Sequence, residues 1–292
     1  MSPITEDQHR EDQHRRALEF RRLHEAQEPF VIPNAWDAGT ARLLTGLGFA
    51  AIASTSAGLA HSLGRSDGAN LVSRDEVLAN ARELAAATHL PVSADLESGY
   101  GADREQIAET IRLAAAAGLV GGSIEDATGD PDAPLHTFAE AVGRVRAAVL
   151  AARELDFPFT VTARAENFLY GRPDLDDTIR RLQAFEEAGA DVLFAPGLPD
   201  AEAVRAVCAA VDRPVNVLVA GPLLELTVDR LGELGVRRIS LGSGLSRLAF
   251  TATMNAARTI RHTGSFAPLT EALPYGSVNA LLAPQDGGPG TE

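Results

Sequence analysis

The sequence predicts an α/β fold, an eight-stranded (β/α)8 TIM barrel, and three observations support this prediction. Short apolar runs bounded by turn residues alternate with longer runs of helical periodicity between residues 29 and 262. Eight such units fit into this part of the 292-residue chain, and a barrel commonly needs about 250 residues. Three strands begin just after a glycine that can end a helix, at Gly48, Gly189 and Gly235. An open doubly wound sheet is the alternative.

The predicted strands are short and apolar, as strands buried on both faces are. They cover residues 30–34, 50–54, 91–95, 121–125, 159–164, 192–195, 215–219 and 238–241. The predicted helices follow at residues 37–47, 74–88, 103–117, 136–154, 174–188, 200–211, 223–234 and 245–262.

Two extensions flank the predicted barrel. Residues 1–28 are expected to form a helical or disordered N-terminal extension, in which the pentapeptide EDQHR occurs twice in tandem. Residues 29–262 form the barrel, and residues 263–292 a C-terminal extension. Its glycine- and proline-rich end is expected to be disordered.

The charged residues exclude several classes of function. The net charge is −14, which argues against nucleic acid or an anionic membrane as a partner, because phosphate binding needs a positive face. The chain has no lysine, so all 26 basic residues are arginines. Schiff-base chemistry and a P-loop both need a lysine and are therefore excluded.

The remaining composition predicts a soluble cytoplasmic protein. Cys208 is the single cysteine, so neither an internal disulfide nor a thiolate metal cluster can form. No apolar run approaches the ~18 residues of a membrane span, and the N-terminus has no apolar signal core.

Acidic residues lie at the carboxyl ends of adjacent predicted strands, where barrels build their active sites. Asp95 ends one strand, with Glu97 just after it, and Glu125 ends the next, so their carboxylates are expected to crowd one another. A divalent cation would relieve this repulsion, and oxygen ligands favour Mg²⁺ first and Mn²⁺ second. Helix capping is the alternative role for these acids.

Other polar residues are expected at the same rim. Arg164 ends a strand just before Glu166, and its planar guanidinium suits a carboxylate or phosphate group, with a salt bridge to Glu166 as the alternative. Asp67 lies in the loop that follows the strand predicted at residues 50–54. The segment Ser54-Thr55-Ser56-Ala57 offers hydroxyl and amide groups for an anion, although such residues are also ordinary in loops.

At these positions the chain resembles the isocitrate lyase/phosphoenolpyruvate mutase superfamily, from about Pro33 to Arg261. The resemblance includes 2-methylisocitrate lyase and carboxyvinyl-carboxyphosphonate phosphorylmutase-like proteins. It is carried by Pro33-Asn-Ala-Trp-Asp37, Ser54-Thr-Ser56, Leu63-Gly-Arg-Ser-Asp67, Asp95-Leu-Glu-Ser-Gly-Tyr-Gly101, Ser123-Ile-Glu-Asp126 and Thr162-Ala-Arg-Ala-Glu166.

The resemblance implies a role for each matching residue. Asp95 would ligate Mg²⁺, with Glu97 acting largely through water and Glu125 as the third acid. Asp67 would lie near the water shell of the metal. Arg164 would bind the far anionic group of the substrate. Thr55, Ser56 and Ala57, flanked by Ser54, would hold its carboxylate, and Tyr100 is a further candidate for substrate binding.

The implied reaction passes through a metal-stabilised enolate of a small oxo acid. The chain lacks the Lys-Lys-Cys-Gly-His loop of isocitrate lyases and has Ala127–Pro134 in its place, which argues for a short-loop member. Cleavage of a C–C bond in a 2-oxo or 2-hydroxy (di)carboxylate is therefore expected first. Decarboxylation, hydrolysis or phosphonopyruvate-type P–C chemistry are the alternatives. The general base stays open between Glu166, Tyr100, His136 and a metal-bound water.

Two alternatives come from other classes. Ser240-Leu-Gly-Ser-Gly-Leu245 precedes a helix and is typical of a phosphosugar-binding barrel, and a non-catalytic oxo-acid-binding barrel is the other. The resemblance also implies a homo-oligomer, a dimer or tetramer in which the last barrel helix packs on a partner subunit. That helix carries apolar Leu248, Phe250 and Met254.

Overall fold

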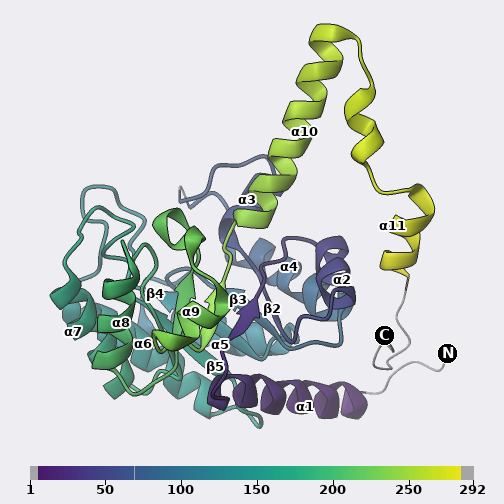
Figure 1. Cartoon of the computed structure of the whole chain (residues 1–292). Coiled ribbons are helices and arrows are strands. Elements are labelled where there is room, and N and C mark those ends of the chain that lie inside the picture. The colour runs from purple at the N-terminus through teal and green to yellow at the C-terminus, as the bar shows by residue number, and fades with distance from the viewer. Residues whose placement is uncertain (1–5, 69, 284–292) are drawn as a thin grey trace.

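A computed structural model describes residues 6–68 and 70–283 of the chain. In this part, eight parallel strands form one sheet in the order β1-β8-β7-β6-β5-β4-β3-β2, with helices around it (Figure 1). The strands are β1 (Phe30–Ile32), β2 (Ile52–Ala53), β3 (Val92–Asp95), β4 (Gly121–Glu125), β5 (Thr160–Arg164), β6 (Val192–Phe194), β7 (Val215–Leu218) and β8 (Arg238–Ser240). Each lies within the residues predicted for it.

The sheet closes between β1 and β2. Residues Asn34 and Ala53 form a parallel bridge just beyond the two strands. The Ala53 amide donates to the Pro33 carbonyl at 2.9 Å, and the Ala35 amide donates to the Ala53 carbonyl at 2.7 Å. The nearly closed ring confirms the predicted (β/α)8 barrel, and the open doubly wound alternative was wrong.

Most helices begin at the polar residue that the sequence places after each strand and loop. Side chains of Asp37, Ser73, Asp103, Thr137 and Asp174 each accept a hydrogen bond from a backbone amide in the first turn. The helices around the barrel are α2 (Ala38–Gly46), α3 (Ser56–Ser62), α4 (Arg74–Ala87), α5 (Arg104–Ala116), α6 (Phe138–Arg153), α7 (Leu175–Glu187), α8 (Ala201–Ala210), α9 (Val228–Glu233) and α10 (Gly244–Thr263), with a 3₁₀ helix η1 (Gly221–Glu225).

Two of these elements differ from the predictions. The short helix α3 follows β2 where a loop was expected, and Thr55 caps it by accepting from the Gly58 amide at 3.2 Å. The helix predicted over residues 223–234 is divided into η1 and α9, because Thr227 starts a new helix by capping the Arg230 amide.

The strands alternate between two environments. Outward-facing side chains such as Ile124, Val161 and Ile239 are buried under the helices in the main apolar core. The positions between them face the barrel interior, and many of these are small and polar, including Ser93, Ser123, Thr162 and Asn216. The apolar core therefore lies outside the ring of strands, between strands and helices.

Helix α1 (Glu6–Glu25) crosses the barrel at the amino ends of the strands (Figure 1). Its Ala17 and Phe20 pack with Ile32, Ala51 and Val120 in a second apolar cluster. The helix contains both copies of the EDQHR repeat, so this part of the N-terminal extension is helical, and residues 1–5 lie outside the described residues.

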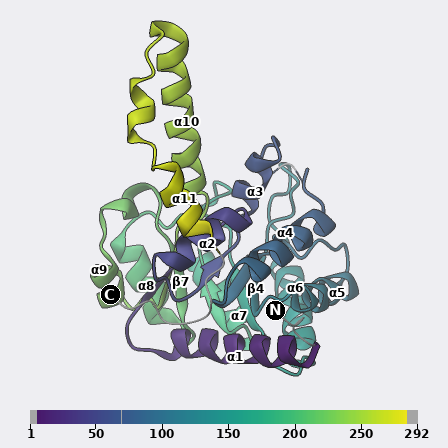
Figure 2. The same ribbon diagram turned by 90° about the vertical axis from the view of Figure 1, so that its right-hand side faces the viewer.

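Helix α10 projects from the opposite end of the barrel, and the chain then returns through the 3₁₀ helix η2 (Ala267–Glu271) to α11 (Tyr275–Leu282) (Figures 1 and 2). We call residues 244–282 the arm. Its end lies beside α2, where Arg42 Nη1 donates to the Leu282 carbonyl at 2.5 Å. Helix α11 was not predicted, and the end expected to be disordered falls on residues 284–292, outside the described ones. Within the described chain, no helix combines the length and apolar character needed to cross a membrane.

Candidate active site

A cavity of about 220 Å³ opens at the carboxyl ends of the strands. This volume lies below the ~300–1,000 Å³ typical of drug-sized ligand sites and therefore suits a small molecule. Its walls contain most of the predicted rim: Ser54, Thr55, Ser56, Ala57, Asp67, Asp95 and Arg164. Glu97, Tyr100, Glu125 and Glu166 are not among its lining residues and lie beside Arg164 or Asp95.

Arg164 is the centre of the charged cluster. Its Nη1 lies 2.9 Å from Asp95 Oδ1, its Nη2 3.1 Å from Glu125 Oε2, and its Nε 2.8 Å from Glu166 Oε1. The guanidinium carbon also lies 5.1 Å from the centre of the Phe194 ring. Arg164 faces the cavity, as its predicted role in binding an anion requires. The salt bridge to Glu166, which was the alternative role, is present as well.

Asp95 is held by neighbours from three strands and loops. The Ser56 hydroxyl donates to Oδ2 at 2.9 Å, and the Ser54 hydroxyl accepts the Asp95 amide at 2.9 Å. Burial alone would raise the pKa of Asp95, but Arg164 and the hydrogen bonds from Ser56 and the Glu97 amide outweigh it and lower that pKa. Asp95 is therefore ionised and fixed in orientation.

The loop after β3 is strained where it carries Glu97 and Tyr100. Their φ angles are 47° and 51°, a left-handed conformation that costs non-glycine residues of order 1–3 kcal/mol and that gathers at functional sites. Burial, with repulsion from Asp95, raises the pKa of Glu97 to about 7. Burial beside Glu97 also raises the pKa of Tyr100, whose hydroxyl has no partner with good hydrogen-bond geometry among the described residues.

The other acids also resist ionisation. Burial, followed by the charge of Asp95, raises the pKa of Asp67. Burial raises the pKa of Glu125 and of Glu166 as well, against the opposing attraction of Arg164. Among the described residues, Arg164 is the cation that pairs with these carboxylates, and it faces more of them than it can neutralise, so a further positive charge beside them would stabilise the cluster.

The donor set fits a hard divalent cation in its chemistry. Asp95, Glu97, Glu125 and Asp67 supply oxygen only, which is what Mg²⁺ prefers. However, no three Asp, Glu, His or Cys side chains in the described chain stand in a ready-made arrangement for a metal ion. Arg164 now holds two of these acids, so binding a cation requires some of the side chains to move. The ligand assignments for Asp95, Glu97 and Glu125 stay predictions.

A buried ion pair beneath the site was missed in the sequence. The Asp126 carboxylate accepts the Glu166 amide at 2.8 Å and the Arg181 Nη1 at 2.9 Å, and Arg181 reaches it from α7. Arg181 also donates through Nε to Asp177 at 2.9 Å. This pair fixes the backbone that presents Glu166 to Arg164. In the sequence, the only indication of this ion pair was that Arg181 lies on the apolar face of α7.

His136 is not brought to the cavity. Its carbonyl accepts a hydrogen bond from Arg181, and its ring lines a separate hollow with Arg104 and Arg144. Burial, with the neighbouring Arg144, lowers the pKa of His136. His136 could act as the general base only if the chain rearranged. The geometry therefore disfavours His136 in that role.

Strands β7 and β8, and the residues just after β1, add polar side chains to which the sequence analysis gave no role of their own in the site. Asn34, Asn216, Arg238 and Ser240 all line the cavity. Asn34 joins three strand ends, because Nδ2 donates to the Ser54 carbonyl at 2.6 Å and Oδ1 accepts the amides of Leu241 and Gly242. The available signals were Asn216, a polar residue inside an otherwise apolar predicted strand, and Asn34 at the end of another.

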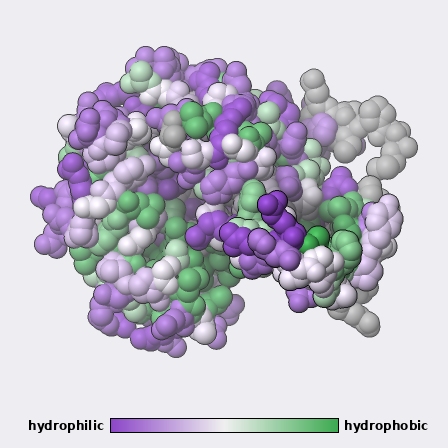
Figure 3. Space-filling model, turned by 90° about the horizontal axis from the view of Figure 1, so that it is seen from above, coloured by the Kyte–Doolittle hydropathy of each residue, from purple (hydrophilic) through white to green (hydrophobic). Residues whose placement is uncertain are grey.

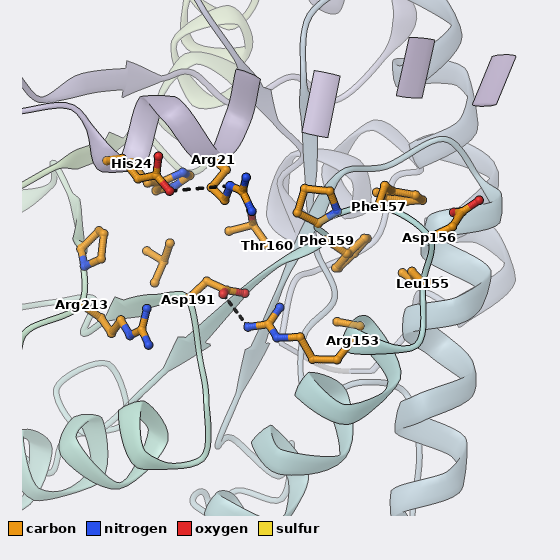
Figure 4. Close-up of a pocket in the computed structure, with 15 residues that line it drawn as sticks. Arg21, His24, Arg153, Leu155, Asp156, Phe157, Phe159, Thr160, Asp191 and Arg213 are labelled. Atoms are coloured by element: carbon orange, nitrogen blue, oxygen red, sulfur yellow. Dashed lines mark hydrogen bonds and ion pairs between the residues drawn. The ribbon is translucent and has the colours of Figure 1, made fainter. Parts of the chain in front are cut away.

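A second cavity of about 460 Å³ lies at the other end of the barrel, where α1 passes the amino ends of β5 and β6 (Figure 4). Its charged side chains are largely paired with each other, Arg153 with Asp191 at 2.6 Å and Arg21 with Glu25 at 3.6 Å. Catalytic groups in barrels lie at the carboxyl ends of the strands, so the smaller cavity is the candidate active site.

The chain is similar to known proteins over most of its length. A family model described as phosphoenolpyruvate phosphomutase matches residues 20–261. A crystal structure from Burkholderia cenocepacia, provisionally described as a lyase/mutase, is 52% identical with a TM-score of 0.91, covering 94% of this chain and 98% of that one. The 2-methylisocitrate lyase of Escherichia coli is 31% identical over 221 residues, covering 73% of each chain.

A further solved structure is informative for its ligands. It is described as a phosphonopyruvate hydrolase complex with oxalate and Mg²⁺, and it is 26% identical to this chain. The TM-score is 0.81, and the match covers 91% of this chain and 94% of the other.

Proposed function

Because the chain belongs to the phosphoenolpyruvate phosphomutase family, within the isocitrate lyase/phosphoenolpyruvate mutase superfamily, we propose that it is a Mg²⁺-dependent carbon–carbon lyase. Its substrate would be a small 2-oxo or 2-hydroxy (di)carboxylate. The observation that carries the proposal is the Arg164 cluster, in which one guanidinium holds Asp95, Glu125 and Glu166 beside a small cavity.

Asp95, Glu97 and Glu125 would hold the metal, with Asp67 close by. A bound divalent cation supplies Lewis-acid stabilisation of negative charge that develops on a substrate oxygen. The phosphonopyruvate hydrolase with oxalate and Mg²⁺ supports this choice of ion and of a carboxylate ligand. Burial chiefly raises the pKa values of Glu97 and Asp67, and repulsion from the Asp95 carboxylate adds to it; a bound cation would offset that repulsion.

The residues of the chain would share the remaining work. The segment Ser54-Thr55-Ser56-Ala57 forms one wall and would orient the substrate carboxylate. Arg164 would hold the other anionic group, as its position facing the cavity supports. Asp67 lines the cavity with a raised pKa, so it can hold or accept a proton there. Glu166 would keep Arg164 in place through the 2.8 Å contact.

Hydrolysis or decarboxylation of an oxo acid is the second candidate, supported by the likeness to the phosphonopyruvate hydrolase. A phosphosugar enzyme is less well supported. The amides of Leu241 and Gly242, which would bind phosphate after β8, already donate to Asn34 at 3.0 and 2.8 Å.

We also propose that the protein is a homo-oligomer, a dimer or tetramer joined through the arm. On α10, Leu248 is 65% exposed and Phe250 52% exposed, and apolar surface also shows on the arm seen from above (Figure 3). Light scattering after size-exclusion chromatography tests this. A monomer at micromolar concentration would contradict it.

The function is tested by incubating the protein with a panel of 2-oxo and 2-hydroxy acids in the presence of Mg²⁺ and identifying products by mass. We expect C–C cleavage of at least one member, abolished by a metal chelator and restored by Mg²⁺. Loss of CO₂ alone would favour the decarboxylase. Binding without turnover across the panel would favour a binding protein and overturn the proposed activity.

A further inference from the structure

The candidate active-site cavity continues downward into the ring of strands. Barrel interiors are commonly filled by layers of bulky branched side chains. Here the strands line the cavity with four small or polar residues, Ser93, Ser123, Asn216 and Ser240, beside the apolar Ile32 and Phe194. The cavity therefore reaches Arg238, the first residue of β8, which forms part of its wall near the barrel centre.

Arg238 is a buried cation that lacks a carboxylate partner in the described part of the chain. Its Nε donates to Asn216 Oδ1 at 2.8 Å, and its Nη1 lies 3.4 Å from His24 Nε2. Both partners are neutral groups. Burial, followed by repulsion from Arg164, lowers the pKa of Arg238 to about 9. A buried charge without a counter-ion is unfavourable, so the binding of a negative group beside Arg238 would be favoured.

His24 does not supply that negative charge and stays neutral itself. Burial lowers the pKa of His24 to about 3. Arginine only donates hydrogen bonds, so His24 Nε2 accepts from Arg238, and Nδ1 donates to the Phe20 carbonyl at 2.8 Å. His24 lines the lower cavity shown in Figure 4, whereas Arg238 is not among its lining residues. Of the two cavities, Arg238 therefore lines only the upper one, and its Nη1 is directed toward His24.

The two arginines of the upper cavity differ in how their charge is balanced. Arg164 pairs with three carboxylates, whereas Arg238 pairs with none among the described residues. We propose that Arg238 is a specificity-determining residue that binds the second carboxylate of a dicarboxylate together with Arg164, while the first carboxylate lies at the segment 54–57. This inference rests on the proposed function, because it names the substrate class of the same site.

An isosteric variant tests the proposal without removing the arginine. Asn216→Asp places a carboxylate 2.8 Å from Arg238 Nε and so neutralises the cation inside the protein. Binding of succinate, a dianion, and of butyrate, a monoanion of equal carbon number, is measured by calorimetry at pH 7. We expect the natural chain to prefer succinate by about tenfold or more, the value of one charge-assisted hydrogen bond. In Asn216→Asp the preference should fall to within about threefold.

Two further variants separate recognition from structure. Arg238→Gln removes the charge without adding a negative one and should lose the same preference for succinate. His24→Gln removes the lower partner of Arg238 and should keep it. If His24→Gln and Arg238→Gln lose the preference for succinate to the same extent, Arg238 only joins α1 to the barrel, and the proposal is overturned. So would a natural chain without preference, or an Asn216→Asp variant that retains it.

The outcome is separable from that of the proposed function. The binding ratio needs no turnover, so a preference that Asn216→Asp abolishes would stand even if every oxo acid remained uncleaved. Conversely, cleavage of an oxo acid by a chain with no preference for succinate would keep the lyase and reject the role of Arg238.

Discussion

Arg164 Nη1 lies 2.9 Å from Asp95 Oδ1, and this contact joins the proposed anion-binding arginine to the first proposed metal ligand. The two groups cannot be considered separately, since a cation that binds Asp95 competes with Arg164 for the same oxygen atom. Metal binding and release of the guanidinium toward a substrate are therefore expected to be coupled.

Asp95→Ala should abolish Mg²⁺ binding and leave the fold intact. Arg164 keeps Glu125 and Glu166 as partners in this variant, so no buried charge is left unpaired. Loss of groups that merely orient metal ligands costs about 10–100-fold in affinity, so loss of a direct ligand should exceed that. Calorimetry with Mg²⁺ measures it, with the exposed Glu105→Gln as control. Unchanged affinity in Asp95→Ala would remove it from the metal site.

Arg164→Lys should weaken the binding of oxalate by about tenfold or more, because charge-assisted hydrogen bonds of this kind contribute about 1.5–3 kcal/mol. Three different nitrogen atoms of Arg164 contact three carboxylates, a geometry that a lysine ammonium cannot reproduce. Inhibition by oxalate is the measurement. Arg180→Lys, at an exposed pair on α7, should leave inhibition unchanged. If both variants behave alike, Arg164 does not contact the anion.

The stability of the metal-free protein should fall as pH rises from about 4.5 to about 7. The pKa of Glu97 is raised from 4.5 to about 7, so in this window the folded state binds more protons than the unfolded state, and the free energy of unfolding decreases with pH. Thermal unfolding over pH 4–8 measures the slope. Glu97→Gln should reduce it, and a slope that is the same in both proteins would show that Glu97 titrates normally.

Arg181→Met should destabilise the fold by about 3–5 kcal/mol, because it leaves the buried Asp126 without its cation. Urea unfolding measures this change. Asp126→Asn combined with Arg181→Met should recover part of the loss, since the uncompensated charge is then gone. An additive effect of the two substitutions would contradict a direct interaction, because contacting residues are expected to be non-additive.

The barrel could be predicted because its signals are local. Each strand is a short apolar run, and a glycine such as Gly189, with a φ of 99°, marks where a helix ends before the next strand. Helix α3 escaped prediction because seven residues, SAGLAHS, are too few to establish a period. Helix α11 is held by a contact with α2 that lies 240 residues away in sequence.

The site was predicted in part for the same reason. Asp95, Glu125 and Arg164 end strands, so their common edge follows from the fold alone. Arg238 begins a strand, and its importance depends on which way the strand alternates and on the small residues opposite it, which sequence spacing does not reveal. The side-chain positions of Glu97 and Tyr100 depend on left-handed backbone angles that non-glycine residues rarely adopt.

The junction of β1 and β2 has a consequence for exchange of amide hydrogens with solvent. Elsewhere neighbouring strands share ladders of two to five residue pairs, but this seam has the single Asn34–Ala53 bridge and the Asn34 side chain. Local opening begins where such bonds are few, so the amide of Ala53 should be among the first in the sheet to exchange. The segment 54–57 starts at that seam, and a bound carboxylate would therefore slow exchange there by holding the ring shut.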